Sequence, residues 1–142
     1  MSVVNRRHDK IFDILHTVAT DVVSPCRQRH AAAIVHHGKI VSIGANRDTT
    51  HPFQHRFAVN KKAVYIHAEL DAINKALKSG LAHAELSNSS LYVLRLKYSG
   101  QDKHSLVRGL SKPCTNGCQQ AIAAFDIRKV FYTTDDGNYE SI

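Results

Sequence analysis

The chain lacks the features of membrane-spanning, secreted and disulfide-stapled proteins. No segment approaches the roughly 20 consecutive apolar residues that a membrane helix needs. The apolar residues of the N-terminal stretch MSVVNRRHDKIFDIL are separated by charges, unlike those of a secretory signal. The three cysteines, Cys26, Cys114 and Cys118, are too few and too unevenly spaced for a disulfide framework. We therefore expect a cytoplasmic protein with no membrane partner, in which cysteines are more often metal ligands or catalytic groups than bridges.

Internal repeats, linkers, low-complexity segments and long runs of one charge are also missing. The apolar share of 43% and the charged share of 22% are ordinary for a globular protein. Since single domains commonly run to about 100–200 residues, we expect one domain over residues 1–142. The net charge of +7 at pH 7 suits a polyanion or a phosphorylated small molecule, but the scattered basic residues fit an ordinary solvated surface equally well.

Hydrophobic periodicity predicts alternating helices and strands. The predicted order is helix, hairpin, helix, strand, helix and strand, at about residues 3–22, 31–45, 66–78, 91–96, 113–125 and 129–134. Two polar segments are predicted as loops, and the first, residues 47–64, is long enough for a binding loop or lid with some helix. The second loop is residues 97–112. A strand, a helix and a strand in succession imply a right-handed crossover and a parallel pair. The expected fold is α/β: an antiparallel hairpin and then a β-α-β unit in one mixed sheet, with helices on both faces.

Two short motifs stand at the starts of predicted helices. The first is His67-Ala68-Glu69 and the second is PCTNGC, residues 113–118. Both helices follow strands and loops, so their N-termini can point into one crevice. A catalytic zinc site uses three protein ligands and leaves the fourth position to water, and one histidine with two cysteines supplies such a set. A helix N-terminus favours a thiolate, and Glu69 lies close enough in sequence to reach water beside the metal.

These motifs carry a resemblance to a known family. His-x-Glu followed by Pro-Cys and a second cysteine resembles the signature of the zinc-dependent nucleobase deaminases. HAELDAI is similar to the motif of deoxycytidylate deaminases and tRNA adenosine deaminases. SKPC, the second cysteine and IRKVFYTTDDG resemble the second half of deoxycytidylate deaminases and small viral relatives. The hairpin ending in Gly44-Ala45-Asn46 also matches, so the resemblance covers most of the chain and implies the three-layer fold of cytidine deaminases.

The resemblance implies roles for individual residues. His67, Cys114 and Cys118 would bind Zn2+, and Glu69 would shuttle protons during hydrolytic deamination. Asn46 and Ala68 would contact the substrate. The relatives assemble as dimers, tetramers or hexamers, so the resemblance also implies a homo-oligomer. Three residues separate the two cysteines, whereas the family signature has two. One possibility is that both cysteines still lie on one face of a helix. The other is that Gly117 forms a bulge in the turn, so that only Cys118 is helical.

The favoured interpretation is deamination of a small-molecule nucleotide, dCMP to dUMP. An enzyme acting on a base in RNA or single-stranded DNA is the alternative, against which the chain shows no nucleic-acid-binding module. A third interpretation is a non-catalytic Cys3His zinc module in which Cys26 is the fourth ligand. Asn46 could instead be a turn residue. His51 could help close over the ligand or be ordinary loop structure, and the aromatic residues of the same region are more typical of core packing than of base stacking.

Overall fold

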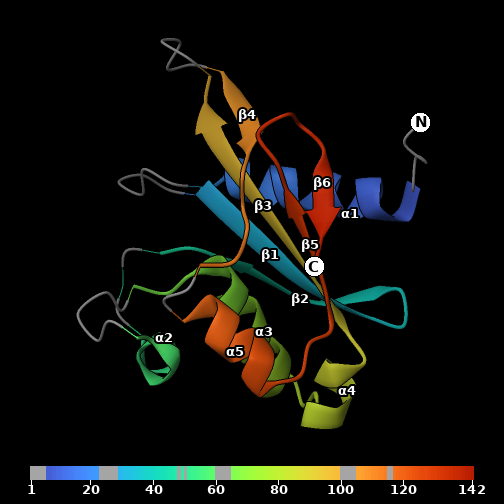
Figure 1. Ribbon diagram of the computed structural model, residues 1–142, viewed down its shortest axis with the longest axis vertical. Coiled ribbons are helices and arrows are strands. Elements are labelled where there is room, and N and C mark those ends of the chain that lie inside the picture. The colour runs from blue at the N-terminus through green and yellow to red at the C-terminus, as the bar shows by residue number, and fades with distance from the viewer. Residues whose placement is uncertain are drawn as a thin grey trace.

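A mixed sheet of six strands organises the protein. The computed structural model describes residues 6–22, 29–47, 49, 51–59, 65–99, 105–114 and 117–142. The strands are β1 (Arg29–His36), β2 (Lys39–Ala45), β3 (Ser90–Tyr98), β4 (Leu106–Gly109), β5 (Lys129–Thr133) and β6 (Tyr139–Ser141). Their order is β2-β1-β3-β5-β6, with β4 paired to the C-terminal half of β3 (Figure 1). The predicted antiparallel hairpin is β1–β2, and the predicted parallel pair is β3–β5. Both predictions are confirmed.

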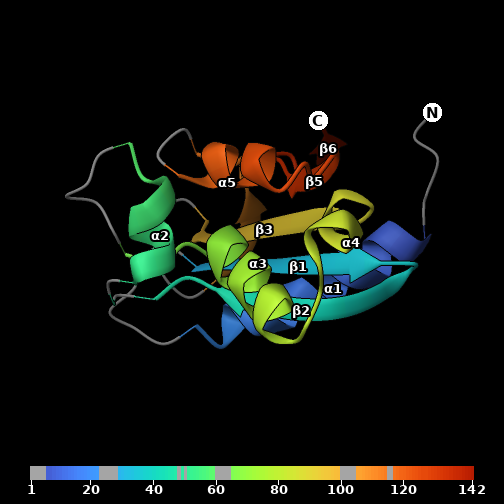
Figure 2. The same cartoon turned by 90° about the horizontal axis from the view of Figure 1, so that it is seen from below.

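Helices cover both faces of this sheet. They are α1 (Arg6–Thr20), α2 (Pro52–Phe57), α3 (Ala68–Lys78), α4 (His83–Ser87) and α5 (Cys118–Ala124). In Figure 1, α1 lies behind the sheet and α3 and α5 lie in front of it, and Figure 2 shows α3 and α1 on opposite sides of β1 from below. These three layers confirm the predicted α/β fold. None of the described helices is long and apolar enough to cross a membrane.

Strand β1 is buried on both faces, which explains its run of small apolar residues. Ala32 and Ile34 belong to the core shared with α3 and α5, whereas Ala31, Ala33 and Val35 belong to the core shared with α1. A strand covered on both sides needs no polar residues at alternate positions. The stretch AAAIV therefore reads as continuous apolar sequence rather than as an alternation.

Gly44 allows α3 to pack directly on β2. A methyl group at Gly44 would lie 2.4 Å from the backbone nitrogen of Ala72 and 2.5 Å from the carbonyl oxygen of Ala68. Two residues earlier on β2, Ser42 donates a hydrogen bond of 2.7 Å from its hydroxyl to the Ala72 carbonyl. These contacts set the height of the first turns of α3 above the sheet, and with it the position of the residues where that helix begins.

The structure differs from the sequence prediction in the segments outside the main elements. The first helix ends at Thr20 rather than at residue 22, and the predicted residues 3–5 lie outside the described part of the chain. The second helix begins at Ala68 rather than at residue 66. Strand β4 lies inside the segment predicted as the loop 97–112, because β3 continues to Tyr98 and the chain folds back along it. Helices α2 and α4 and strand β6 are three to six residues long. They are too short for a periodic pattern, so only their tertiary pairing reveals them.

Candidate functional site

Three predicted metal ligands come together at the starts of α3 and α5. His67 is the N-cap residue of α3, Cys114 lies in the segment before α5, and Cys118 is the first residue of α5. The His67 Nδ1 atom lies 3.3 Å from the Cys118 sulfur and 3.4 Å from the Cys114 sulfur. One ligand atom from each residue lies within 4.8 Å of the others, and the described residues contain no other such group of His, Cys, Asp and Glu.

The spacing of these three atoms fits a tetrahedral zinc ion. Zn–S bonds of about 2.3 Å and Zn–N bonds of about 2.0–2.1 Å at tetrahedral angles separate nitrogen from sulfur by about 3.6 Å. The two observed nitrogen–sulfur distances are within a few tenths of an ångström of that value. Imidazole and thiolate are also the donors that zinc prefers. Among the described residues no fourth ligand joins the group, and Cys26 lies outside the described residues.

Buried Gln54 of α2 links the two ligand-bearing segments. Its side-chain oxygen accepts a hydrogen bond of 3.1 Å from the backbone N–H of His67. On its other side, the side-chain nitrogen of Gln54 lies 2.8 Å from where a methyl group at Gly117 would be. Gln54 is fully buried, so it touches both the N-cap of α3 and the turn before α5. The sequence analysis missed this residue, because a six-residue helix carries too few positions to mark one of them as buried.

Gly117 explains the spacing of three residues between the cysteines. Its φ of 116° lies in the left-handed region that glycine adopts without strain. The helix therefore begins at Cys118, and Cys114 is held from outside it by a hydrogen bond of 3.0 Å from Gln119 N to its carbonyl. The predicted helix start near Pro113 was wrong, because the turn at Gly117 precedes the first helical residue. The alternative in which only Cys118 is helical is confirmed.

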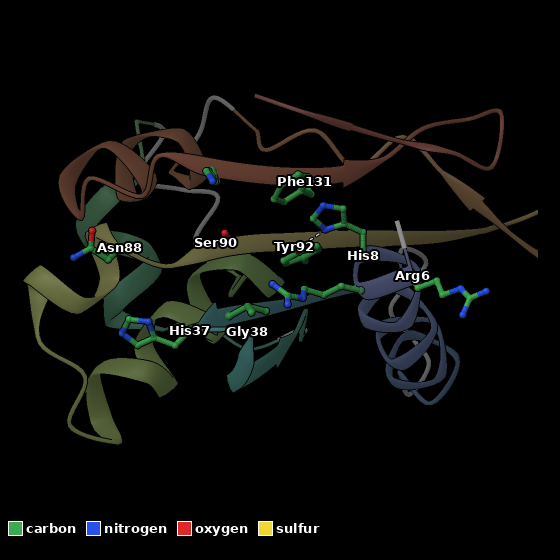
Figure 3. A pocket seen from close by; sticks show the side chains of 11 residues that line it. Arg6, His8, His37, Gly38, Asn88, Ser90, Tyr92 and Phe131 are labelled. Carbon is green, nitrogen blue, oxygen red and sulfur yellow. Dashed lines mark hydrogen bonds between the residues drawn. The ribbon is translucent and has the colours of Figure 1, made fainter. Parts of the chain in front are cut away.

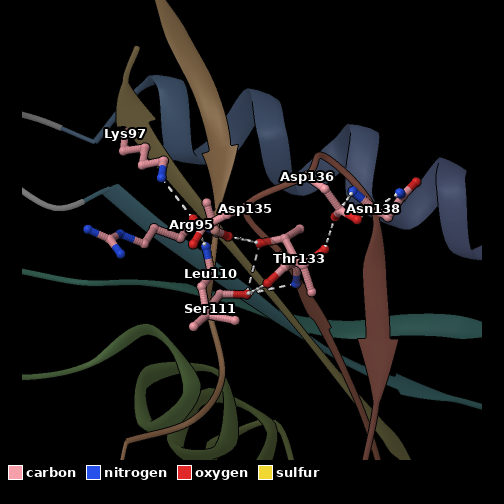
Figure 4. A network of polar contacts seen from close by, with 10 residues as sticks. Arg95, Lys97, Leu110, Ser111, Thr133, Asp135, Asp136 and Asn138 are labelled. Carbon is pink, nitrogen blue, oxygen red and sulfur yellow. Dashed lines mark hydrogen bonds and ion pairs between the residues drawn. The ribbon is translucent and has the colours of Figure 1, made fainter. Parts of the chain in front are cut away.

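A polar network fixes the segment that leads to Cys114 (Figure 4). The Ser111 hydroxyl donates 2.8 Å to the Val93 carbonyl and accepts 2.8 Å from Thr133 N, so Ser111 lies between β3 and β5. Thr133 in turn donates 2.7 Å from its hydroxyl to the Gly109 carbonyl. Ser111 and Thr133 are both buried. At the end of the parallel pair β3–β5, the segment that leads to Cys114 therefore lies between the two strands.

Glu69 lies in the first turn of α3 with its carboxyl group beside the ligands. It is only 5% exposed, and burial raises the pKa of this carboxyl although His67 and the Cys118 thiol oppose the shift. The pKa of Cys114 is lowered, first by a hydrogen bond with the Cys118 thiol and then by one with His67. That of Cys118 is raised by the same shared hydrogen bond and by burial. The first thiolate of the pair therefore forms at Cys114, and a buried carboxyl suited to proton transfer lies next to it.

His30 and Arg95 flank the ligands from the sheet, and the sequence analysis missed both. They are opposite each other in the β1–β3 ladder. The pKa of His30 is lowered to about 4 by burial and then by the charges of Arg95 and His67, which places His30 near both. The Nε atom of Arg95 is buried and has no hydrogen-bond partner among the described residues. A basic residue in a strand has no sequence signal that assigns it to the site.

The two residues predicted to contact the substrate lie at this same end of the sheet. Asn46 follows β2, and its side-chain oxygen accepts a hydrogen bond of 2.8 Å from His30 N. Ala68 is fully buried as the first residue of α3. The buried Asp71 carboxylate joins α3 to the end of β2 by accepting 3.1 Å from Ala45 N. His51 caps α2 by accepting from Phe53 N at 3.1 Å, which is an ordinary structural role in its loop.

Comparison with known proteins agrees with this geometry. The family model for the cytidine and deoxycytidylate deaminase zinc-binding region matches residues 5–134. A structure of dCMP deaminase from the cyanophage S-TIM5, in apo form, has 19% identity and a TM-score of 0.61, covering 94% of this chain and 86% of the phage protein. A cytidine deaminase structure from Burkholderia pseudomallei has 17% identity and a TM-score of 0.64, covering 95% and 91%. No curated protein matches the chain. The match over residues 5–134, on a chain whose fold brings one histidine and two cysteines together, shows that it belongs to the cytidine and deoxycytidylate deaminase family of zinc-dependent hydrolytic enzymes.

Proposed function

We propose that the protein deaminates a cytosine nucleotide, with dCMP as substrate and dUMP as product. The observation that carries the proposal is the three-ligand group His67, Cys114 and Cys118 with the buried Glu69 carboxyl beside it. A closed structural zinc site needs four protein ligands, and the described residues supply three. A site of three ligands leaves one position to water, which is what a hydrolytic reaction at the ring carbon requires.

In this proposal the chain supplies ligands, proton transfer and substrate contacts. Bound zinc would supply Lewis acidity that makes water nucleophilic at neutral pH. Glu69 accepts a proton from the attacking water and passes it to N3 of the cytosine ring. It then takes the proton of the new C4 hydroxyl and delivers it to the departing amine. Water and the C4 amine are thereby converted to a C4 carbonyl and ammonia. Burial raises the pKa of Glu69, which suits a carboxyl group that must both accept and release a proton.

Arg95 supports a phosphorylated substrate. A buried guanidinium N–H that has no partner in the described part of the chain is costly, and a substrate phosphate could accept from it. Arg95 lies across from His30, which is electrostatically coupled both to Arg95 and to the ligand His67. The cation is therefore on the same side of the sheet as the metal ligands. Asn46 holds the backbone of His30 from the other side, and we propose that Asn46 and Ala68 border the bound nucleoside.

A substrate panel tests this proposal. The zinc-loaded protein is incubated with dCMP, deoxycytidine, adenosine and a cytosine-containing single-stranded oligonucleotide, and ammonia release is followed. We expect turnover of dCMP, and we expect Arg95→Gln to raise KM for dCMP while leaving KM for deoxycytidine nearly unchanged. Turnover confined to the oligonucleotide would favour the alternative of a nucleic-acid base deaminase. Zinc binding without turnover of any of these compounds would favour a non-catalytic zinc module.

The assembly and location of the protein stay predictions. A homo-oligomer is expected from the family resemblance, and light scattering at two protein concentrations would measure it. The cytoplasmic location and the extent of the single domain over residues 1–142 are likewise expectations from the sequence.

A further inference from the structure

A cavity lies far from the metal ligands, at the opposite end of the sheet. It has a volume of about 650 Å³ and opens between the start of α1, the β1–β2 turn and the first residues of β3 and β5 (Figure 3). In the β1–β3 ladder the cavity borders the pair Val35–Ser90, whereas the metal ligands adjoin the pair His30–Arg95. Five residues of strand separate these pairs, which corresponds to about 16 Å. The cavity also faces α1 rather than α3, because its wall residue Tyr92 belongs to the core under α1.

The lining of this cavity is basic. Among the described residues, its titratable lining comprises cations, imidazoles and one tyrosine, without a carboxylate: Arg6, Arg7, His8, His37, Tyr92 and Lys129. Arg7 reaches across to the β1–β2 turn, where its guanidinium carbon lies 3.9 Å from the position of a methyl group on Gly38. Burial and then the charge of Arg7 lower the pKa of His8, and Lys129 lowers it further, so both cations lie near the same imidazole. Asp9, the next residue of α1, is the acidic group that opposes this shift.

The position of the two arginines adds a second observation. Arg6 and Arg7 are the first residues of α1, a helix of 15 residues. The N-terminus of a helix carries partial positive charge and favours acidic side chains or bound anions. Two arginines there add positive charge to the positive end of the helix dipole. An anion in the cavity would accept hydrogen bonds from the guanidinium groups and lie near the start of the described helix.

The wall of the cavity is aromatic. The rings of Tyr92 and Phe131 are stacked with centroids 4.8 Å apart, and the His8 ring lies 4.3 Å from that of Phe131. The His8 Nδ1 atom is 2.5 Å from the Tyr92 hydroxyl, which holds the imidazole against this wall. Figure 3 shows His8, Tyr92 and Phe131 on one side and His37 with Gly38 on another. A flat apolar wall below clustered cations suits a ligand that carries phosphate on an organic body.

We propose that this cavity binds a free phosphate-bearing small molecule, with Arg7 and Lys129 as the groups that hold the phosphate. Guanidinium groups bind phosphate through two parallel hydrogen bonds, and lysine adds a point charge. The basic residues gather around one cavity, whereas a polynucleotide backbone needs a continuous basic stripe across the surface, so this arrangement favours a free ligand. The site is separate from the candidate active site in position and in the residues that form it, so it does not depend on the proposed function.

Calorimetric titration with inorganic tripolyphosphate tests this site directly. We expect saturable binding by the zinc-loaded protein, weakened by about tenfold or more in the double variant Arg7→Ala/Lys129→Ala, since two charge-assisted contacts are lost. The control variant Lys10→Ala/Lys78→Ala also removes two positive charges, but from exposed residues that do not line the cavity. It should bind tripolyphosphate as the unaltered protein does. Arg95→Gln should also bind normally, which distinguishes the cavity from the metal end of the sheet.

A second measurement locates the bound ligand on the protein, and it remains informative if the double variant does not fold. Amide chemical shifts on adding tripolyphosphate should change at Gly38 and Ser90 and not at His67. The milder single variant Arg7→Gln should weaken binding in the same direction. Unchanged affinity in the cavity variants, shift changes confined to the metal end, or the absence of saturable binding would each overturn the proposal. So would binding that is confined to a single-stranded oligonucleotide and lost in the double variant, because it would make the cavity part of a nucleic-acid surface.

Discussion

Replacing Gly44 with alanine should separate α3 from the sheet and misplace His67 and Glu69, the proposed zinc ligand and proton shuttle at the start of this helix. The added methyl group would lie 2.4 Å from Ala72 N, whereas ordinary contact begins at 3.4 Å, so the helix must move by about 1 Å. Both atoms that the methyl group meets are backbone atoms, which cannot rotate away as a side chain can. Overpacking of this kind costs about 1–3 kcal/mol of unfolding free energy. A shift of about 1 Å in a reacting group can reduce turnover by about a hundredfold.

The assay compares urea unfolding, zinc content and dCMP turnover in Gly44→Ala and in Gly109→Ala. The control methyl group at Gly109 would meet the flexible Lys97 side chain, with a nearest contact of 3.0 Å, so it should cost less than about 1 kcal/mol. We expect Gly44→Ala to lose stability and turnover together. Wild-type unfolding and turnover in that variant would show that the first turns of α3 are not held by contact with β2. The unfolding measurement decides this even if dCMP proves not to be the substrate.

Three further predictions follow from the site and the core. Glu69→Gln should keep stoichiometric zinc and lose at least about a hundredfold in turnover, because the amide cannot shuttle protons; loss of zinc instead would make Glu69 a ligand. Gln54→Leu should leave the buried N–H of His67 without an acceptor, costing about 1–3 kcal/mol in unfolding and about 10–100-fold in zinc affinity measured by chelator competition; unchanged zinc affinity would contradict a supporting role. The pKa of His8 is lowered by burial and then by Arg7, so the unfolded chain takes up this proton first as pH falls below 6.5. Unfolding free energy should therefore decrease from pH 7.5 to 5.5, and the decrease should be smaller in His8→Phe; an equal decrease in both would assign it to other groups.

The sequence alone contained the chemistry of the metal site. His67, Cys114 and Cys118 were identifiable because zinc accepts few donor types and because two motifs with those donors stand at the starts of two predicted helices. The main helices and strands were also predictable, since each is long enough to show a period or a continuous apolar run. The residues that surround the ligands were not predictable. Gln54, His30 and Arg95 belong to segments in which no sequence pattern distinguishes a polar residue of the site from other polar residues.

Tertiary structure decided how the ligands are held. Cys114 lies outside α5 because the chain turns at Gly117, and that turn lies against Gln54 of a helix too short to be recognised. The cysteine segment is placed by Ser111 between β3 and β5, a contact between residues far apart in the chain. Local patterns record which residues can bind a metal. Contacts between distant segments determine whether their side chains meet, because a hydrogen bond across 13 or 22 residues leaves no periodic trace in the sequence.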